Sequence, residues 1–498
     1  MKTLLTIIAF ATLLVGPASN ANATEIVNNG RALESHTNQN DLQNMSLYEI
    51  RLRGLKVFST PFTKADGFGD GPAGFTAKER AQNGNRPTIN ANGTFSRFNG
   101  LDSQSCLECH SVISRAAIPM TFGIGGTGGI NDTPVGGATF FNINDDENQI
   151  NPPSSALGTT GQFNINGRAI NPPFVFGSGG VELVGNEMTE DLQQLANSLQ
   201  PGSSVTLKTK GINFGTLSRN LNGDFETENV NGIENDPDSP NFLVVQPFGR
   251  KGNNITTRTF DLGAMPFHMG MQPDEILYEQ LNGEPPAPEL DGTINIDGDG
   301  DLVVNELLIG DMSVLSVFMA TLEPPVKKKL KRTAKRGKAF FNSVGCASCH
   351  RPVLRTRSSI LGLRYPEIAN NPSENIFLNI DLSDEPTNFP TTRKGGIKVR
   401  LFADLKTHDM GPSLAEANGD SFFTTARLWG VIDTAPYLHD GRALTIKEAI
   451  EQHGQPGSEA EDAVNNFFNT LSQKDRNDIY KYLGTIRTPS HPAEDLLN

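Results

Sequence analysis

Two short stretches, Cys106-Leu107-Glu108-Cys109-His110 and Cys346-Ala347-Ser348-Cys349-His350, contain all four cysteines of this 498-residue chain. In each stretch, two thiols three residues apart are followed directly by an imidazole. This spacing is typical of covalent c-type haem attachment, in which each thiol bonds one vinyl group and the histidine binds the iron. A Cys-x-x-Cys redox pair, two disulfides or a split zinc site would leave both histidines unexplained. We therefore expect two covalently bound haems, with attachment at Cys106, Cys109, Cys346 and Cys349 and proximal ligands His110 and His350.

Length and composition indicate a globular protein of several domains. At roughly 150 residues per domain, the chain corresponds to two to four domains. It is 36% hydrophobic and 20% charged, with 50 glycines and 31 prolines, so we expect many turns and long loops. The net charge of -14 argues against binding to nucleic acid or to an anionic membrane. A docking partner is expected to be basic.

Residues 1–23 have the layout of a secretory signal peptide. Lys2 precedes an apolar run at 4–15, and Ala21-Asn22-Ala23 provides a small-residue cleavage site. The alternative, a buried N-terminal helix, fits less well because the run is short and ends at a helix breaker. We expect cleavage after Ala23 and export to the periplasm or beyond. The mature chain would have a net charge of -15 (41 basic minus 56 acidic residues) and no membrane span.

The order of motifs predicts a mainly α protein with long loops and two cytochrome c-like haem domains. The N-terminal domain would cover 24–325 and include a Gly/Asn-rich insert of loops and short strands at about 123–247. The C-terminal domain would cover 326–498. Within the insert, residues 205–207 and 242–245 read as strands. Apart from the haem motif, we find no internal repeat.

Helical patterns lie outside the insert. They are predicted near 274–281, 302–322 and 326–341. Ser472 and Asp475 form a capping box that begins a final amphipathic helix.

A second capping box, Thr445-x-x-Glu448, begins a helix that presents His453 as a candidate distal iron ligand. Its apolar stripe is formed by Ile446, Ala449 and Ile450, with His453 at the next position on the same face. A buried histidine bonded to a carbonyl is the alternative interpretation. The rival ligand is Met410, whose thioether would raise the haem potential relative to imidazole.

For the first haem, the candidate distal ligands are Met120, His268 and Met271. The remaining alternative is an open sixth position on one iron, which peroxide chemistry requires.

Residues 295–306 fit the twelve-residue register of an EF-hand calcium loop. Gly300 stands at position 6 and Leu302 at the hydrophobic position 8. The candidate ligands are Asn295, Asp297, Asp299, Asp301 and Glu306. An acidic, solvated turn is the alternative. Because the loop precedes the second haem domain, we expect bound Ca²⁺ to clamp the interdomain segment.

Several longer motifs resemble one family, the bacterial di-haem oxidoreductases, a peroxidase-like or thiol-oxidoreductase-like group related to di-haem cytochrome c peroxidases. The resemblance covers most of 50–485. It includes Phe58-Ser59-Thr60-Pro61-Phe62, Gln246-Pro247-Phe248-Gly249-Arg250-Lys251-Gly252 and Phe267-His268-Met269-Gly270-Met271-Gln272. The most specific motifs are Phe423-Thr424-Thr425-Ala426-Arg427-Leu428-Trp429-Gly430, Tyr437-Leu438-His439-Asp440-Gly441-Arg442-Ala443 and Glu448-Ala449-Ile450-Glu451-Gln452-His453-Gly454.

The resemblance implies a role for His453 as the sixth ligand of the electron-transfer haem. The related peroxidases have Met at this place and a methylamine-pathway relative has Tyr, so His implies a lower potential. The turn at His439 and Asp440 could support the haem pocket, or Asp440 could serve only the turn. Trp429, the single tryptophan, could relay electrons, although packing is the more ordinary role.

Together these features predict an exported di-haem oxidoreductase, with peroxidase-like activity favoured. One six-coordinate haem would take electrons from a small periplasmic donor, and a catalytic haem would act on peroxide or another small molecule. The alternative is a non-catalytic electron carrier in which His or Met saturates both irons. The length of the chain and its loop-rich insert favour the enzyme.

Overall fold

The computed structural model describes residues 30–69, 103–110, 121–124, 167–170, 173, 175–416, 419–489 and 493–497. The predicted signal segment 1–23, the candidate ligand Met120 and part of the predicted insert lie outside these residues. In the described part, helices are joined by long loops and short antiparallel strands, as predicted. The cytochrome c-like character of the two domains stays a prediction. No helix in the described ranges is long and apolar enough to cross a membrane.

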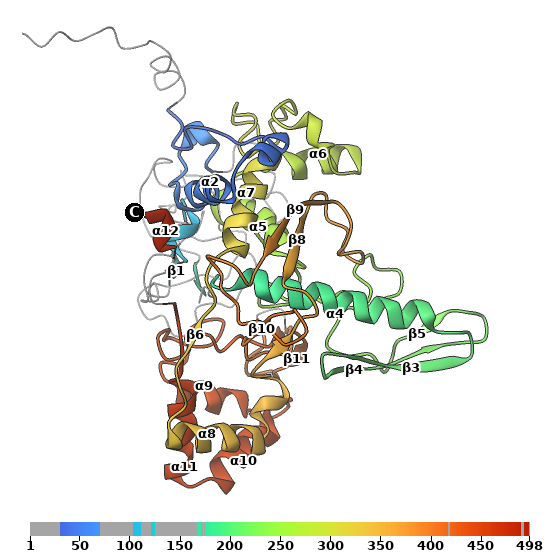
Figure 1. Ribbon diagram of the computed structural model, residues 1–498, viewed down its shortest axis with the longest axis vertical. Coiled ribbons are helices and arrows are strands. Elements are labelled where there is room, and N and C mark those ends of the chain that lie inside the picture. Colours follow the sequence, from blue (N-terminus) through green and yellow to red (C-terminus); the bar gives the residue numbers. More distant parts are fainter. Residues whose placement is uncertain are drawn as a thin grey trace, which may run out of the picture.

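One end of the molecule is built from α2 (Leu47–Ser59), α5 (Thr257–Ala264), α6 (Asp274–Asn282) and α7 (Ile309–Ala320). Figure 1 shows α2, α6 and α7 toward the upper end of the long axis. α7 is buried along its whole length, and the ring of Phe318 lies 5.4 Å from that of Phe58 in α2. The helices predicted near 274–281 and 302–322 are thus confirmed, the second only from Ile309 onward.

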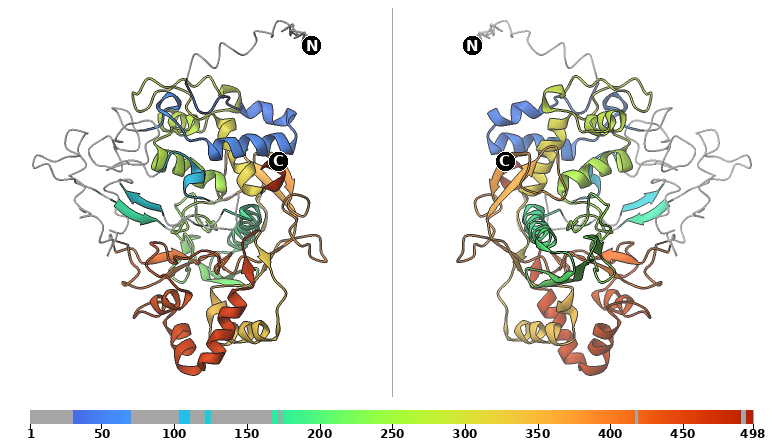
Figure 2. Two further views of the ribbon diagram at one scale, coloured as in Figure 1. Left: turned by 90° about the vertical axis from the view of Figure 1, so that its left-hand side faces the viewer. Right: turned by 90° about the vertical axis from the view of Figure 1, so that its right-hand side faces the viewer.

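The other end contains α8 (Arg332–Ser343), α9 (Ile446–His453), α10 (Glu461–Thr470) and α11 (Gln473–Leu483). Both views in Figure 2 place these helices opposite the blue α2. α11 begins at Ser472, whose side chain accepts a hydrogen bond from the backbone N–H of Asp475, as the capping motif predicts. Phe341 of α8 packs against Tyr482 of α11, with ring centres 5.6 Å apart.

Between the two ends lies α4 (Ser178–Ser198), a long helix within the segment that we expected to contain only loops and short strands. That expectation was wrong at α4. The strand predicted at 205–207 is confirmed as part of β3 (Ser203–Thr209), which pairs with β4 (Ile212–Arg219). β5 (Phe225–Glu226) completes this antiparallel sheet, whereas 242–245 is not a strand.

Residues 354–399 connect the predicted C-terminal domain to α4. They carry β7 (Leu354–Arg355), β8 (Ile360–Arg364), β9 (Ile376–Asp381) and β10 (Lys398–Val399). The backbone N–H of Arg357 donates to the Glu187 carboxylate of α4 at 2.7 Å, and its guanidinium donates to Glu190 at 2.8 Å. Segments on both sides of the predicted boundary at 325 therefore pack together.

The remaining elements are short. The strand pairs are β1 (Thr121–Ile124) with β2 (Gly167–Ile170), β6 (Val326–Lys327) with β13 (Ile486–Arg487), and β11 (Thr407–Asp409) with β12 (Phe422–Thr424). Short helical turns are η1 (Gln39–Asn44), η2 (Lys64–Asp66), η3 (Cys106–Glu108), η5 (Met265–Met269), η6 (Pro288–Leu290), η7 (Cys346–Ser348) and α12 (Glu494–Leu497). α12 returns to the first end, where Asp495 pairs with Arg51 of α2.

Candidate functional site

The two Cys-x-x-Cys-His motifs fold alike. In each, the cysteines frame a single 3-10 turn, η3 or η7. The backbone N–H of His110 donates to the carbonyl of Cys106 at 2.9 Å, and that of His350 donates to the carbonyl of Cys346 at 3.0 Å. None of the four cysteines forms a disulfide. The turn therefore places two thiols and an imidazole side by side in both copies.

His453 of α9 lies beside His350 of the second motif. Their ring centres are 6.5 Å apart, with an angle of 50° between the ring planes. The Nδ1 of His350 donates to the carbonyl of Phe402 at 3.0 Å, and that of His453 donates to the carbonyl of Ala449 at 2.7 Å. Nε2 is then the nitrogen left for a metal on each ring.

Both rings are held neutral. Burial, followed by the nearby His453, lowers the pKa of His350 to about 4. Burial also lowers the pKa of His453. A neutral imidazole with its Nδ1 proton fixed is the form that binds a metal through Nε2. The capping box at Thr445 sets the start of α9, and Gly454 follows its last residue, His453. The rival ligand Met410 follows β11, where its backbone N–H donates to Ser421.

His268 lies near His110 of the first motif. The Nδ1 of His110 donates to the carbonyl of Pro173 at 3.0 Å. Burial lowers the pKa of His110 to about 4, and the charge of His268 acts in the same direction. His268 lies in the π-helical turn η5, while Met271 is fully buried in the hydrophobic core. The structure therefore places His268 near the first haem motif.

Asp261 is a residue of this region that the sequence analysis missed. It belongs to α5, which runs directly into η5. Its carboxylate is buried, and Oδ2 has no hydrogen-bond partner. Burial raises its pKa well above the usual range. Burial also raises the pKa of the Cys106 thiol, with the charge of Asp261 as the next cause. A buried acid thus lies beside Cys106 of the first motif, and no local sequence pattern marks it.

His408 is a second residue that was missed, beside Cys349. Its Nε2 faces the carboxylate of Asp404 at 3.1 Å and its Nδ1 that of Glu459 at 2.7 Å. Burial opposes a charge on this ring, but the bonds to Asp404 and Cys349 raise its pKa to about 11. The ligand atoms of Cys349, Asp404 and His408 lie within 4.8 Å of one another, close enough for a metal. Two carboxylates already engage the imidazole, so we interpret this group as an ion-pair cluster around the second motif.

Trp429 and His439 belong to the motifs at 423–430 and 437–443, which together with 448–454 form the C-terminal signature of the chain. The ring of His439 stacks on Phe423 with centres 4.6 Å apart, and its buried Nε2 has no partner. Burial lowers its pKa to about 4. Asp440 pairs with Arg442 and accepts from its backbone N–H, so Asp440 stabilises the turn. The buried Nε1 of Trp429 donates to the carbonyl of Arg400 at 2.5 Å.

The basic motif at 246–252 lies against this signature. Lys251 stands 3.8 Å from the centre of the Phe423 ring. Arg250 pairs with Glu416 at 2.6 Å, and its carbonyl accepts from the backbone N–H of Thr424 at 2.9 Å. Two motifs that are far apart in the sequence are therefore in contact.

The loop at 295–306 gathers three of its predicted ligands. The carboxylates of Asp297, Asp299 and Asp301 lie within 4.8 Å of one another. Leu302 is 90% exposed and has a positive φ of 74°. It therefore does not serve as the buried residue of an EF-hand, and that expectation was wrong.

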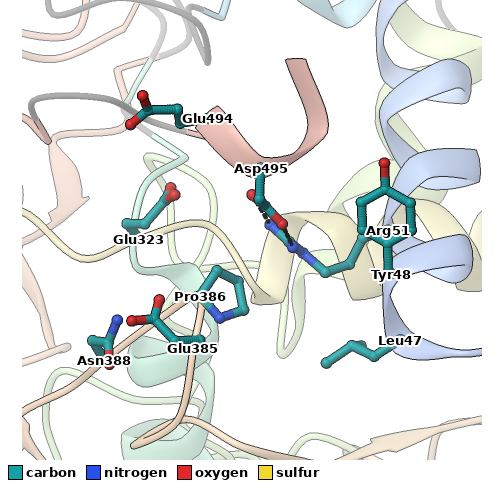
Figure 3. A pocket seen from close by; sticks show the side chains of 9 residues that line it. All are labelled: Leu47, Tyr48, Arg51, Glu323, Glu385, Pro386, Asn388, Glu494 and Asp495. Atoms are coloured by element: carbon teal, nitrogen blue, oxygen red, sulfur yellow. Dashed lines mark hydrogen bonds and ion pairs between the residues drawn. The ribbon is translucent and has the colours of Figure 1, made fainter. Parts of the chain in front are cut away.

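A surface pocket of about 630 Å³ lies elsewhere, between α2 and the chain end. Figure 3 shows its acidic lining and the pair of Arg51 with Asp495. Its lining consists of Leu47, Tyr48, Arg51, Glu323, Glu385, Pro386, Asn388, Glu494 and Asp495. None of these residues belongs to a haem motif, so this pocket is separate from the candidate redox sites.

Residues 384–486 match a family described as "Di-haem oxidoreductase, putative peroxidase". This segment of the chain is therefore similar to the di-haem oxidoreductase family. The matched residues contain the signature around Trp429 and His439 and the whole of α9 with His453. The resemblance stated from the sequence is confirmed here. No curated protein gives a significant match.

Two solved structures are distantly similar to this chain. The first is hydrazine synthase from Kuenenia stuttgartiensis, pressurised with 20 bar xenon, at 17% identity and a TM-score of 0.20. That match covers 36% of this chain and 55% of the other, so the chain spans about half of that relative. The second, at 10% identity and a TM-score of 0.27, is a MauG-like protein associated with microbial copper homeostasis. That match covers 64% of this chain and 90% of the MauG-like protein.

Proposed function

We propose that this protein carries two covalently attached c-type haems and acts as an exported oxidoreductase with a peroxidase-like reaction. The pairing of His350 with His453 carries the proposal. An imidazole nitrogen lies about 2 Å from a metal it binds, so two imidazoles on opposite sides of one iron have ring centres about 6 Å apart. The observed separation of 6.5 Å fits this arrangement. The thiols of Cys346 and Cys349, which form no disulfide, would supply the attachment.

A haem bound there supplies one-electron chemistry. The chain itself fixes both imidazoles through the carbonyls of Phe402 and Ala449, so that the Nε2 atoms of His350 and His453 would hold the iron. In this proposal, the second site passes electrons and the first is where the substrate reacts. With its Oδ2 unpartnered, the buried acid Asp261 is suited to hold and deliver a proton beside the first site. Reduction of one peroxide to two waters consumes two electrons and two protons.

The electron donor is proposed to be a small basic periplasmic protein. The mature chain has a calculated net charge of -15, which favours association with a partner of opposite charge. Export rests on the signal-like segment at 1–23.

The second candidate function is a non-catalytic electron carrier. The position of His268 near His110 favours it, because a second histidine pair would saturate both irons. Coordination number separates the two functions.

The decisive experiment combines mass, electron paramagnetic resonance and turnover on the exported product, purified after expression of the full chain. We expect the mass of chain 24–498 plus two haems, one high-spin and one low-spin ferric signal, and peroxide reduction with a reduced donor protein. Two low-spin signals without turnover would establish the carrier instead. A colourless product with the mass of the bare chain would overturn both functions.

A further inference from the structure

The acidic loop at 295–306 is already shaped by its own backbone. The carboxylate of Asp297 accepts from the backbone N–H groups of Gly300 at 2.6 Å and Leu302 at 3.1 Å. That of Asp299 accepts from Asp301 at 3.2 Å. These bonds keep three carboxylates pointing into one small volume, within 4.8 Å. The loop is therefore preorganised for an ion that prefers oxygen ligands.

A separate element aims an unpartnered oxygen at this loop. Gln272 is only 3% exposed, and its buried Oε1 has no hydrogen-bond partner. A Cβ on Gly298, between Asp297 and Asp299, would lie 2.5 Å from that oxygen. Buried amide oxygens rarely lack a partner, and an amide oxygen is a usual calcium ligand.

The surroundings contain an excess of buried acid. The side chain of Glu306 is only 3% exposed. Both carboxylate oxygens of the nearby buried Asp274 have no partner. Arg31 and Lys64 are the cations whose charges act on Asp301. A divalent cation would compensate acids that are otherwise buried together.

Asn295 is less suited to bind the same ion. Its side-chain oxygen accepts from Asn305 at 2.9 Å, and its amide donates to the carbonyl of Thr293 at 2.9 Å. Gln272 can take its place as the neutral ligand.

The loop is also connected to the segment that carries His268. The backbone N–H of Gln272 donates to Glu306 at 2.8 Å. Gln272 follows His268 by four residues, and the carbonyl of Met269 between them accepts from Gly69 at 3.1 Å. Figure 1 shows α6, which begins at Asp274, at the same end of the molecule as α2 and α7.

We propose that Asp297, Asp299, Asp301, Glu306 and Gln272 bind one Ca²⁺ ion, and that this ion fixes the 265–272 segment beside the first haem motif. The cation site stands independently of the haems. Its coupling to His268 rests on the proposed function.

Calorimetry on chelator-treated holoprotein tests the site itself. We expect one saturable Ca²⁺ site with weaker Mg²⁺ binding, and at least tenfold weaker Ca²⁺ affinity in Gln272→Leu and in Asp299→Asn. Gln280→Leu removes an exposed amide from α6 and should bind Ca²⁺ like the wild type. Gln272→Glu keeps an oxygen at the site and should retain binding even if Gln272→Leu misfolds. Absence of Ca²⁺ heat, or equal affinity in Gln272→Leu, would overturn the site.

Electron paramagnetic resonance tests the coupling. Removal of Ca²⁺ should change the signal of the first haem and leave that of the second haem, assigned through His453→Ala, unchanged. Ca²⁺ binding without any change in the first signal would overturn the coupling alone. A haem-free product that still binds Ca²⁺ would overturn the proposed function and leave the cation site standing.

Discussion

Gly337 of α8 lies against Asp478 of α11 so closely that a Cβ on Gly337 would be 1.8 Å from the Asp478 backbone oxygen. Gly54 of α2 lies equally close to Val314 of α7, since a Cβ on Gly54 would be 2.1 Å from the Val314 backbone oxygen. The backbones of each helix pair therefore touch at a glycine. The backbones can approach this closely only because glycine has no side chain.

Substitution of Gly337 by Ala should destabilise the protein. Ala is favoured over Gly in a helix by about 1 kcal/mol, but overpacking typically costs about 1–3 kcal/mol, and here the clash is with backbone. The backbone clash places the cost at the upper end of this range, so we expect a net loss of about 2 kcal/mol in the free energy of unfolding, measured by urea denaturation. Gly263→Ala in α5 is the control, since its Cβ would meet no atom within 4 Å. Equal stability of the two variants would contradict the assigned helix contact.

The paired helices form an internal repeat that the sequence analysis did not find. In both copies an Arg-Gly pair, Arg53-Gly54 or Arg336-Gly337, is followed by a phenylalanine four residues after the glycine. Each phenylalanine packs against an aromatic ring of the partner helix, Phe318 or Tyr482. That ring lies four residues after the residue whose carbonyl oxygen the glycine approaches, Val314 or Asp478. The signal is only three residues long, and the partner helices carry no shared motif. The repeat became recognisable only once the helix contacts were known.

Local patterns predicted more than long-range ones. The capping boxes at Thr445 and Ser472 correctly predicted α9 and α11, because they depend on neighbouring residues. α4 was missed because its glycines were interpreted as loop signals. Gly179 instead permits close packing, since its Cβ would lie 2.2 Å from the carbonyl oxygen of Ala320. The positions of Asp261 and Gln272 likewise depend on contacts between distant segments.

Replacement of His453 should change the electron paramagnetic resonance signal of one haem only. His453→Ala should remove one low-spin ferric signal, whereas His453→Met should keep a low-spin iron and raise its reduction potential. Electron paramagnetic resonance and spectroelectrochemical titration check both outcomes. His36→Ala, which removes a histidine paired with Asp311, is the control and should leave both signals intact. An unchanged low-spin signal in His453→Ala would reopen the assignment to Met410.

Trp429 is expected to act mainly in packing. The ring is 3% exposed, and a Cβ on Gly177 would lie 2.9 Å from it. Trp429→Phe loses the bond to the Arg400 carbonyl and leaves a gap, which should cost about 2 kcal/mol of unfolding free energy. Phe422→Leu, at a half-exposed side chain, should change stability little. Unchanged stability together with slower electron transfer between haems would instead support the relay role.

Glu182 should make stability fall as the pH rises. Its side chain is buried in α4 and accepts from the backbone N–H of Thr257 at 3.1 Å. Burial, followed by the charge of Glu367, raises its pKa from 4.5 to about 7. The folded state therefore binds a proton more tightly than the unfolded state does. The stabilisation is complete below pH 4.5 and is lost as the pH rises to about 7.

The size of this effect can be measured by comparing Glu182→Gln with the wild type. A shift of this size corresponds to about 3 kcal/mol at most, so wild-type unfolding free energy should decline by up to that amount relative to the variant between pH 4 and pH 8. Because glutamine stays neutral, the variant should have a flatter profile. Glu228→Gln changes an exposed carboxylate and should reproduce the wild-type profile. If Glu182→Gln also follows the wild-type profile, Glu182 is ionised throughout this range, and a neighbouring group must compensate its charge.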